Sequence, residues 1–253
     1  RSRRPRPKGQ PGSVSVSRSL STEDGGTGGE AGDLRAVIGS AGPVPRSGRA
    51  LDTQQRLLDA AAAVFAEAGY EAARVADITR RAGVAHGSFY RYFGDKDAIL
   101  QELLLRLYDE LGAATRDPEA AGEERDDAQM RAQLLQFNVR FFHEYASRRG
   151  LLRVAREAAA STGPGCFRDI WFVMRGRFIA RTQRLIERLQ SRGHARGLDP
   201  ALTAEALGAM SEQMAYVLVG LPEEAPPAER LTAIGHACSD VWLRTLFFTE
   251  GPA

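Results

Sequence analysis

Residues 86–96 bring together hydrogen-bonding and cationic side chains of the kinds that contact nucleic acid. The set comprises His86, Gly87, Ser88, Tyr90, Arg91, Tyr92 and Lys96. On a short helix, such groups can reach base edges in the major groove and the phosphate oxygens beside it. The chemistry that this spacing indicates is recognition of double-stranded DNA.

Two short helices, over residues 75–82 and 86–93, are predicted to position these side chains. The residues spaced to face inward are Val75, Ile78, Ala82, Val84, Phe89 and Phe93. Gly83 lies between the helices and supplies the backbone freedom that a tight turn needs. Two helices joined in this way form a helix-turn-helix unit.

Longer helices are predicted on both sides of this unit. The preceding helix has apolar residues at spacings of three and four, which is typical of one buried face. Asp52 or Thr53 is expected to cap its start, and Gly69 to end it in a left-handed conformation. Asp95 is expected to cap the helix that follows.

These motifs resemble those of the TetR family of bacterial repressors. The matching positions are residues 65, 69–70, 78, 82–84, 87–93 and 95–97. The resemblance implies contacts with bases or the groove for His86, Ser88 and Arg91. It implies contacts with phosphates, which set the register of the protein on the duplex, for Tyr90, Tyr92 and Lys96.

Two positions depart from the family pattern. The family usually has Ser or Thr where this chain has Arg74, and Ser where it has Ala85. Both positions usually cap the helix that follows, and the loss of a cap costs about 1 kcal/mol. Arg74 could add a phosphate contact instead. Arg80 and Arg81 are either contacts with the DNA backbone or a solvated helix end.

The rest of the chain is predicted to be helical. Gly and Pro residues separate five further stretches, near 127–147, 150–160, 166–192, 199–219 and 227–248. We therefore expect an all-α fold of about nine helices. An N-terminal three-helix DNA-binding domain (49–97) would precede a larger α-helical ligand-binding and dimerisation domain (98–253).

Residues 1–48 differ from the body of the chain in composition. They hold ten Gly, eight Ser and five Pro, so we expect a disordered tail. The first 50 residues carry nine basic and four acidic groups, whereas the remainder carries 25 basic and 28 acidic groups. Any DNA contact by the body must therefore come from a local basic patch. The basic start of the tail is either a DNA-contacting arm or a solvated segment.

Enzyme, cofactor and metal chemistry find no support in the sequence. No Ser, Cys or carboxylate lies at a spacing typical of catalysis from His143, His194 or His236. The sequence also has no Gly-rich phosphate loop and no metal-binding motif. Cys166 and Cys238 are interpreted as small helix-packing residues, and their low number fits a reducing cytoplasm. For a bacterial DNA-binding protein, we expect a cytoplasmic location in association with the nucleoid. No secretory signal and no membrane-spanning run are expected.

Aromatic and polar residues in the larger domain suggest an effector site. The candidate lining is Phe137, Phe141, Trp171, Phe178, Glu212 and Tyr216. Aromatic stripes are usually plain core, and that alternative stays open. The family resemblance implies a small-molecule pocket in this domain, and such pockets are largely apolar with a few polar groups.

A weaker resemblance concerns one branch of the family, which includes the mycobacterial repressor of ethionamide activation. It is carried by residues 141–142, 155–156, 171 and 211–212. The family also implies a homodimer through the last two helices. Residues suggested for that interface are Ala201, Ala206, Gly208, Ala209, Ala215, Ile234, Ala237, Val241, Trp242 and Leu246.

The sequence thus predicts a ligand-responsive transcriptional regulator, most simply a repressor. It would bind a palindromic operator as a homodimer and be released by a small apolar molecule. Two alternatives remain: a DNA-binding activator or architectural regulator without a ligand, and an enzyme on an all-α domain, which no acid–base pair supports.

Overall fold

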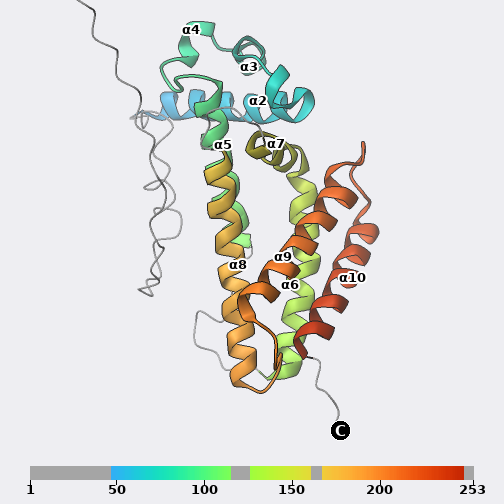
Figure 1. Ribbon diagram of the computed structural model, residues 1–253. Coiled ribbons are helices and arrows are strands. Elements are labelled where there is room, and N and C mark those ends of the chain that lie inside the picture. The colour runs from blue at the N-terminus through green and yellow to red at the C-terminus, as the bar shows by residue number, and fades with distance from the viewer. Residues whose placement is uncertain (1–46, 115–125, 161–166, 248–253) are drawn as a thin grey trace, which may run out of the picture.

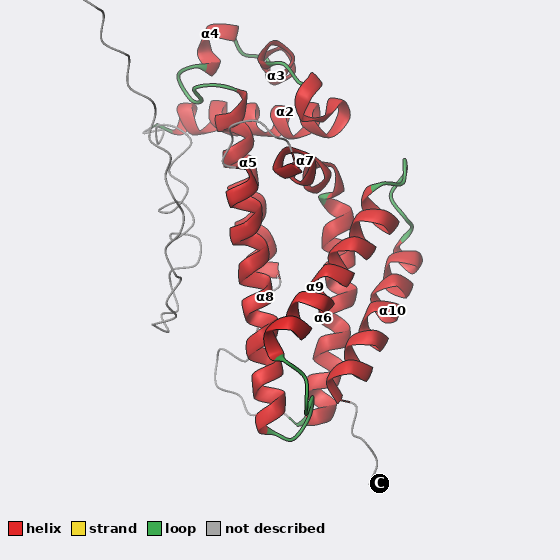
Figure 2. Cartoon of the chain, in the orientation of Figure 1, coloured by secondary structure: helices red, strands yellow, loops and turns green. Residues whose placement is uncertain are grey.

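The computed structural model describes residues 47–114, 126–160 and 167–247. Within these ranges every regular element is helical, with nine α-helices and one π-helical turn (Figure 2). The predicted all-α fold of about nine helices is confirmed. Cys166 and nearly all of the predicted N-terminal tail lie outside the described residues.

Three helices gather at one end of the molecule (Figure 1). They are α2 (Gly48–Ala72), α3 (Val75–Ala82) and α4 (His86–Phe89). α2 lies across the start of the long helix α5 (Lys96–Ala114), and α3 and α4 lie on the side of α2 that faces away from the other helices. The predicted helix-turn-helix unit is therefore presented at the tip of the fold.

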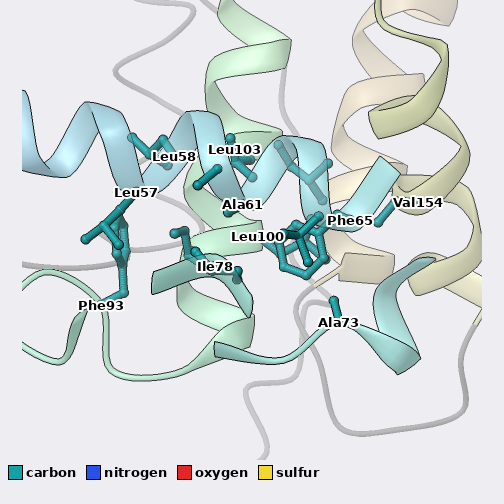
Figure 3. Packing of buried hydrophobic residues seen from close by; sticks show 14 of the residues in the cluster. Leu57, Leu58, Ala61, Phe65, Ala73, Ile78, Phe93, Leu100, Leu103 and Val154 are labelled. Atoms are coloured by element: carbon teal, nitrogen blue, oxygen red, sulfur yellow. The ribbon is translucent and has the colours of Figure 1, made fainter. Parts of the chain in front are cut away.

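One apolar core holds this end together (Figure 3). It contains the buried side chains Leu57, Leu58, Ala61, Phe65, Ile78, Phe89, Phe93, Leu100 and Leu103. Val154 of α7 (Arg149–Ala160) and Phe167, the first residue of α8 (Phe167–Ser191), belong to the same core. The small unit thus shares its interior with the larger domain, which couples their positions.

Gly83 and Asp95 behave as expected, whereas Gly69 kinks its helix and does not end it. Gly69 has φ 76° and Gly83 has φ 64°, in the left-handed region where residues with a side chain are strained. The carboxylate of Asp95 accepts a hydrogen bond from the backbone amide of Ala98 at 2.8 Å, and so caps α5. After the kink at Gly69, α2 continues to Ala72.

Two expectations for these helices are wrong. α2 begins earlier than predicted, because Ser47 accepts the amide of Ala50 at 3.3 Å, so neither Asp52 nor Thr53 is its cap. α4 is shorter than predicted. It ends at Phe89, and residues 90–92 form a turn closed by backbone hydrogen bonds to Phe89.

The larger domain is built from two helix pairs. α10 (Ala228–Phe247) packs along α6 (Asp127–Ser147), and α9 (Pro200–Ala215) packs along α8 (Figure 1). The bounds of α6, α7, α8 and α10 lie within one residue of those predicted. α9 instead passes into the π-helical turn η2 (Tyr216–Gly220), which a hydrogen bond from the Leu221 amide to the Tyr216 carbonyl closes.

Candidate DNA-binding and effector sites

The turn between α3 and α4 is set by buried apolar anchors. Ile78 of α3 and Phe89 of α4 are both fully buried, and Gly83 supplies the left-handed turn between them. Arg74 and Ala85 occupy the two N-cap positions, and neither makes a side-chain capping hydrogen bond. The predicted loss of both caps is confirmed, so packing against the shared core holds these two short helices in place.

Most of the predicted DNA contacts lie on the outer face of this unit. The exposed residues among them are Arg74, His86, Gly87, Tyr90 and Arg91. Tyr90 is 54% exposed, which rules out core packing for its ring. Its ring centroid lies 5.7 Å from that of His86 and 5.4 Å from that of Phe89, so the side chain rests on the helix surface.

The remaining predicted contacts are partly enclosed. Ser88 is half-buried, and half-buried Tyr92 packs against the apolar core, which leaves part of its surface for solvent. Lys96 is also half-buried, and its ammonium group contacts backbone carbonyls at the end of α2. These three residues stay candidates for DNA contact, but Tyr92 and Lys96 already have contacts within the protein.

The two arginines at the end of α3 are engaged in ion pairs. Arg80 lies 2.7 Å from the carboxylate of Asp77, one helical turn away. Arg81 donates to both oxygens of Glu67 on α2, at 2.8 and 2.7 Å. All four side chains are substantially exposed, so these pairs contribute little to stability. They do orient both guanidinium groups along the protein surface.

The predicted effector residues fall into two groups. Phe137 of α6 and Phe178 of α8 stack with ring centroids 6.3 Å apart. Phe141 meets Tyr145 on the same helix at 6.2 Å. Among the described residues, half-buried Trp171 makes no ring contact with any of these aromatics.

The polar members lie where α7, α8 and α9 meet. The guanidinium of Arg156 covers the ring of Tyr216 at 3.9 Å. Arg175 lies 3.3 Å from the carboxylate of Glu212 and 2.5 Å from that of Glu205. Burial raises the pKa of Glu212, although the charge of Arg175 acts in the opposite direction. This end of the candidate site therefore offers two cations balanced by two carboxylates.

A buried polar cluster in the larger domain was missed by the sequence analysis. It consists of Asn138 on α6, Ser211 on α9, and Cys238 and Trp242 on α10. The available signal was the spacing of Leu134, Asn138 and Phe142, which puts a polar residue in an apolar stripe. The predicted burial of Cys238 is confirmed, and burial raises the pKa of its thiol.

The histidines of the larger domain occupy surface or structural positions. His143 Nε2 lies 3.1 Å from Thr232 Oγ1, and His194 Nε2 lies 2.7 Å from a carboxylate oxygen of Asp127. His236 is exposed. The described residues hold no cluster of three or more His, Cys, Asp or Glu suited to a metal ion.

The faces of α9 and α10 differ from the predicted dimer seam. Gly208, Ala215, Ile234, Trp242 and Leu246 are buried inside the protomer, so that part of the prediction is wrong. The physical reason is that α9 and α10 use these residues to pack on α8 and α6. The other five predicted residues, Ala201, Ala206, Ala209, Ala237 and Val241, are exposed on the outward faces of α9 and α10. Leu202 on α9, Val217 in η2 and Leu221 after η2 add further exposed apolar surface.

Comparisons with known proteins agree with the fold and the exposed helix-turn-helix face. Residues 57–103 match the sequence model of the family described as bacterial regulatory proteins, tetR family. The A-factor receptor protein of Streptomyces griseus is 32% identical over 163 residues, which are 64% of this chain. That match spans about half, 53%, of the receptor's own length.

Two longer matches extend into the larger domain. The transcriptional regulator EthR of Mycolicibacterium smegmatis is 29% identical over 208 residues, covering 81% of this chain and 87% of EthR. The crystal structure of the regulator PfmR from Thermus thermophilus superposes with a TM-score of 0.60 at 25% identity, covering 75% of this chain and 97% of PfmR.

The fold and the face formed by α3 and α4 define a helix-turn-helix DNA-binding regulator. The chain belongs to the TetR family of transcriptional regulators, which are not enzymes. The family predicted from the sequence motifs is thereby confirmed. None of the helices in the described ranges is long and apolar enough to cross a membrane.

Proposed function

We propose that this protein is a homodimeric repressor that binds a palindromic operator and is released by a small, largely apolar effector in the bacterial cytoplasm. The observation that carries the proposal is the exposure of Tyr90 and Arg91 beside the buried anchors Phe89 and Phe93. The buried anchors hold the exposed side chains in a defined position on the protein surface. A helix that enters a DNA groove requires such positioning.

The proposed functions are assigned to two consecutive parts of the chain. Residues 49–97 would bind DNA, and residues 98–253 would bind the effector and the second subunit. The DNA-facing side chains proposed are Arg74, His86, Ser88, Tyr90, Arg91, Tyr92 and Lys96, with Gly87 permitting close approach. In a two-fold dimer, the two copies of this face would enter successive major grooves about 34 Å apart.

The effector site is proposed between the helices of the larger domain, lined by the Phe137–Phe178 stack, Phe141, Trp171, Tyr216 and Glu212. Half-buried aromatic rings favour an apolar ligand because they offer surface that binding would remove from water. The relative in Streptomyces griseus is named a receptor, which supports a ligand-binding role for a chain of this kind.

α7 is proposed to carry the signal to the DNA-binding unit together with α5. Arg153 of α7 donates to the carbonyl oxygen of Ala66 on α2 at 2.9 Å. At the start of α7, Arg149 donates to the carbonyl oxygen of Pro222 at 2.7 Å, just after η2. A shift of α9 or η2 would therefore move α7 and, with it, α2.

Such a mechanism is a population shift between two spacings of the recognition helices. An effector can displace this equilibrium only by its differential affinity for the two states. The Phe137–Phe178 stack joins α6 to α8, so a ligand that separates these rings favours the state in which the helices are farther apart.

Operator binding is tested first. Genomic footprinting with the full-length protein identifies the operator, and fluorescence anisotropy then compares wild type with Arg91→Gln and Tyr90→Ala. Each variant should bind at least about fivefold more weakly, and Arg91→Gln should also relax base preference. Arg230→Gln, an exposed position on α10, is the matched control and should bind as wild type does.

Effector release is tested separately, with metabolite extracts of the source organism added to the protein–operator complex. Dissociation by an apolar fraction supports the repressor proposal. Unchanged operator binding by both recognition-face variants would contradict the DNA site. Operator binding that no extract fraction alters would instead favour a regulator without a ligand.

A further inference from the structure

Six side chains from four helices of the larger domain form a circuit of five contacts that closes through the backbone of α6. Phe137 stacks on Phe178, and the Phe178 ring meets that of Trp242 at 6.5 Å. Trp242 Nε1 lies 3.2 Å from Ser211 Oγ, which lies 3.4 Å from Cys238 Sγ. Cys238 Sγ reaches Asn138 Oδ1 at 3.8 Å, and Asn138 adjoins Phe137 on α6. The circuit therefore joins the aromatic stack to the buried polar cluster.

The available donors assign the Trp242–Ser211 and Cys238–Asn138 hydrogen bonds of the circuit. Trp242 Nε1 can only donate, so Ser211 Oγ accepts from it. The Ser211 hydroxyl donates to the carbonyl oxygen of Leu207, which lies 2.9 Å away and one turn back on α9. Burial raises the pKa of the Cys238 thiol, so the thiol keeps its proton and donates to Asn138 Oδ1.

Asn138 is left with an unused donor. Its residue is only 1% exposed, and within the described part of the chain its Nδ2 meets no acceptor. Buried amide groups without a partner are rare because their desolvation is not repaid. Asn138 is also the only asparagine in the 253-residue sequence.

α10 packs closely on α6 at Val139, the residue that follows Asn138. α10 meets α6 at Gly235, where an added Cβ would lie 2.6 Å from Val139 Cα. Among the described residues Asn138 Nδ2 has no acceptor, so a bound molecule that carried one would satisfy it.

We propose that Asn138 selects the effector, an otherwise apolar molecule whose carbonyl oxygen, as in a ketone or ester, accepts the hydrogen bond from Nδ2. This inference rests on the proposed effector-responsive function. Phe137 precedes Asn138 on α6, and its half-buried ring, stacked on that of Phe178, would hold the apolar part of such a molecule. A neutral donor in an apolar surround discriminates by the presence of an acceptor, not by charge.

Matched probes separate the carbonyl from the hydrocarbon. Calorimetric titration of the full-length protein compares nonan-2-one with 2-methylnon-1-ene, and 4-phenylbutan-2-one with 3-methylbut-3-enylbenzene. In each pair a C=CH₂ group replaces C=O at nearly the same shape. The ketones should bind about three- to tenfold more tightly, because one neutral hydrogen bond is gained.

Asn138→Leu should bring the ketone-to-alkene affinity ratio to about one. Ser239→Ala is the control: Ser239 is equally buried but is satisfied within its own helix, where its hydroxyl donates to the Gly235 carbonyl at 2.8 Å. That variant should keep the wild-type ratio. Equal binding of ketones and alkenes by wild type overturns the inference, as does a preference for ketones that Asn138→Leu retains.

A second measurement needs no variant. Protein labelled with ¹⁵N-asparagine gives a single side-chain amide pair, because the chain has one asparagine. Ketone binding should shift one of its two protons downfield, and the alkene should not. A ketone that binds without moving this resonance, or failure of every probe to bind, also overturns the inference. The proposed repressor function is tested separately, by operator binding and by release of the operator in the presence of extracts.

Discussion

The ammonium nitrogen of Lys96 lies 2.8 Å from the carbonyl oxygen of Tyr70 and 4.2 Å from the centroid of the Tyr70 ring. It also lies 3.4 Å from the carbonyl oxygen of Glu71. The last carbonyls of a helix have no hydrogen-bond partner within that helix. Lys96, the first residue of α5, donates to two such carbonyls and so caps the end of α2. The Tyr70 hydroxyl donates to the carboxylate of Asp97, which ties the two helices a second time.

Replacing Lys96 should therefore lower stability as well as DNA affinity. Lys96→Met removes a charge-assisted hydrogen bond from a half-buried carbonyl, and we expect a loss of about 2 kcal/mol in the free energy of unfolding. Urea denaturation measures this loss. Arg91→Gln, an exposed position of the same unit, should leave the unfolding midpoint unchanged. Lost operator binding with an unchanged midpoint in Lys96→Met would show that Lys96 acts on DNA alone.

The sequence predicted the helices well because apolar spacing and Gly or Pro punctuation are local signals. Gly69 marks a kink, and Gly83 and Asp95 mark helix boundaries, through their own backbone or capping chemistry. The role of Lys96 was hidden because its acceptors lie 26 and 25 residues earlier in the chain. Asn138 was missed for a related reason, since a polar residue is normally exposed and only the packing of four helices buries it.

The orientation of α9 and α10 shows a different limit of sequence reasoning. Both helices carry apolar residues on two faces, so spacing alone could not separate the inner face from the outer one. Trp242 and Val241 are neighbours, yet Trp242 is 1% exposed and Val241 is 43% exposed. Contacts with α6 and α8 decide which residue turns inward.

The contact between α7 and α2 leaves no room for a side chain at Gly150. A Cβ added there would lie 2.7 Å from the Cβ of Ala66. Gly150→Ala should force α7 away from α2 and cost about 1–2 kcal/mol, as overpacking does. Thermal denaturation and operator titration measure the two consequences: a lower unfolding temperature and an altered operator affinity.

The control for Gly150 lies on α8. Gly176 is exposed in mid-helix, and a Cβ there meets nothing within 4 Å. Gly176→Ala should raise stability by about 0.5–1 kcal/mol, because alanine is the better helix former. If both alanine variants gain stability, the α2–α7 contact is looser than its geometry indicates.

The outward faces of α9 and α10 offer a test of the proposed dimer. Val241→Asp would place a carboxylate beside its own symmetry copy in a two-fold interface. Like charges there cost several kcal/mol, so we expect the dissociation constant of the dimer to rise by at least about a hundredfold. Sedimentation equilibrium measures it, and operator affinity should fall in parallel.

Phe172→Asp is the matched control for Val241→Asp. Phe172 is 62% exposed on α8 and lies outside the proposed interface. The same change there should leave the dimer intact. Dissociation by both variants, or by neither, would contradict an interface formed by α9 and α10.

Glu212 should give stability a distinctive pH dependence. Burial raises the pKa of its carboxyl above the ordinary value of 4.5, although Arg175 opposes the shift. The folded protein therefore binds the proton more tightly than the unfolded chain does. The stabilising contribution is complete below about pH 4.5 and is lost as pH rises through the raised pKa.

Glu212→Gln should remove this loss, because the amide stays neutral while Arg175 keeps Glu205 at 2.5 Å. The difference in urea midpoint between wild type and variant should move in favour of the variant as pH rises from about 4 to 7. Glu187→Gln, exposed on α8, should show no such trend. A midpoint difference that moves in favour of wild type over this range would mean that attraction to Arg175 outweighs burial at Glu212, and that the polar end of the effector site is better hydrated than its geometry implies.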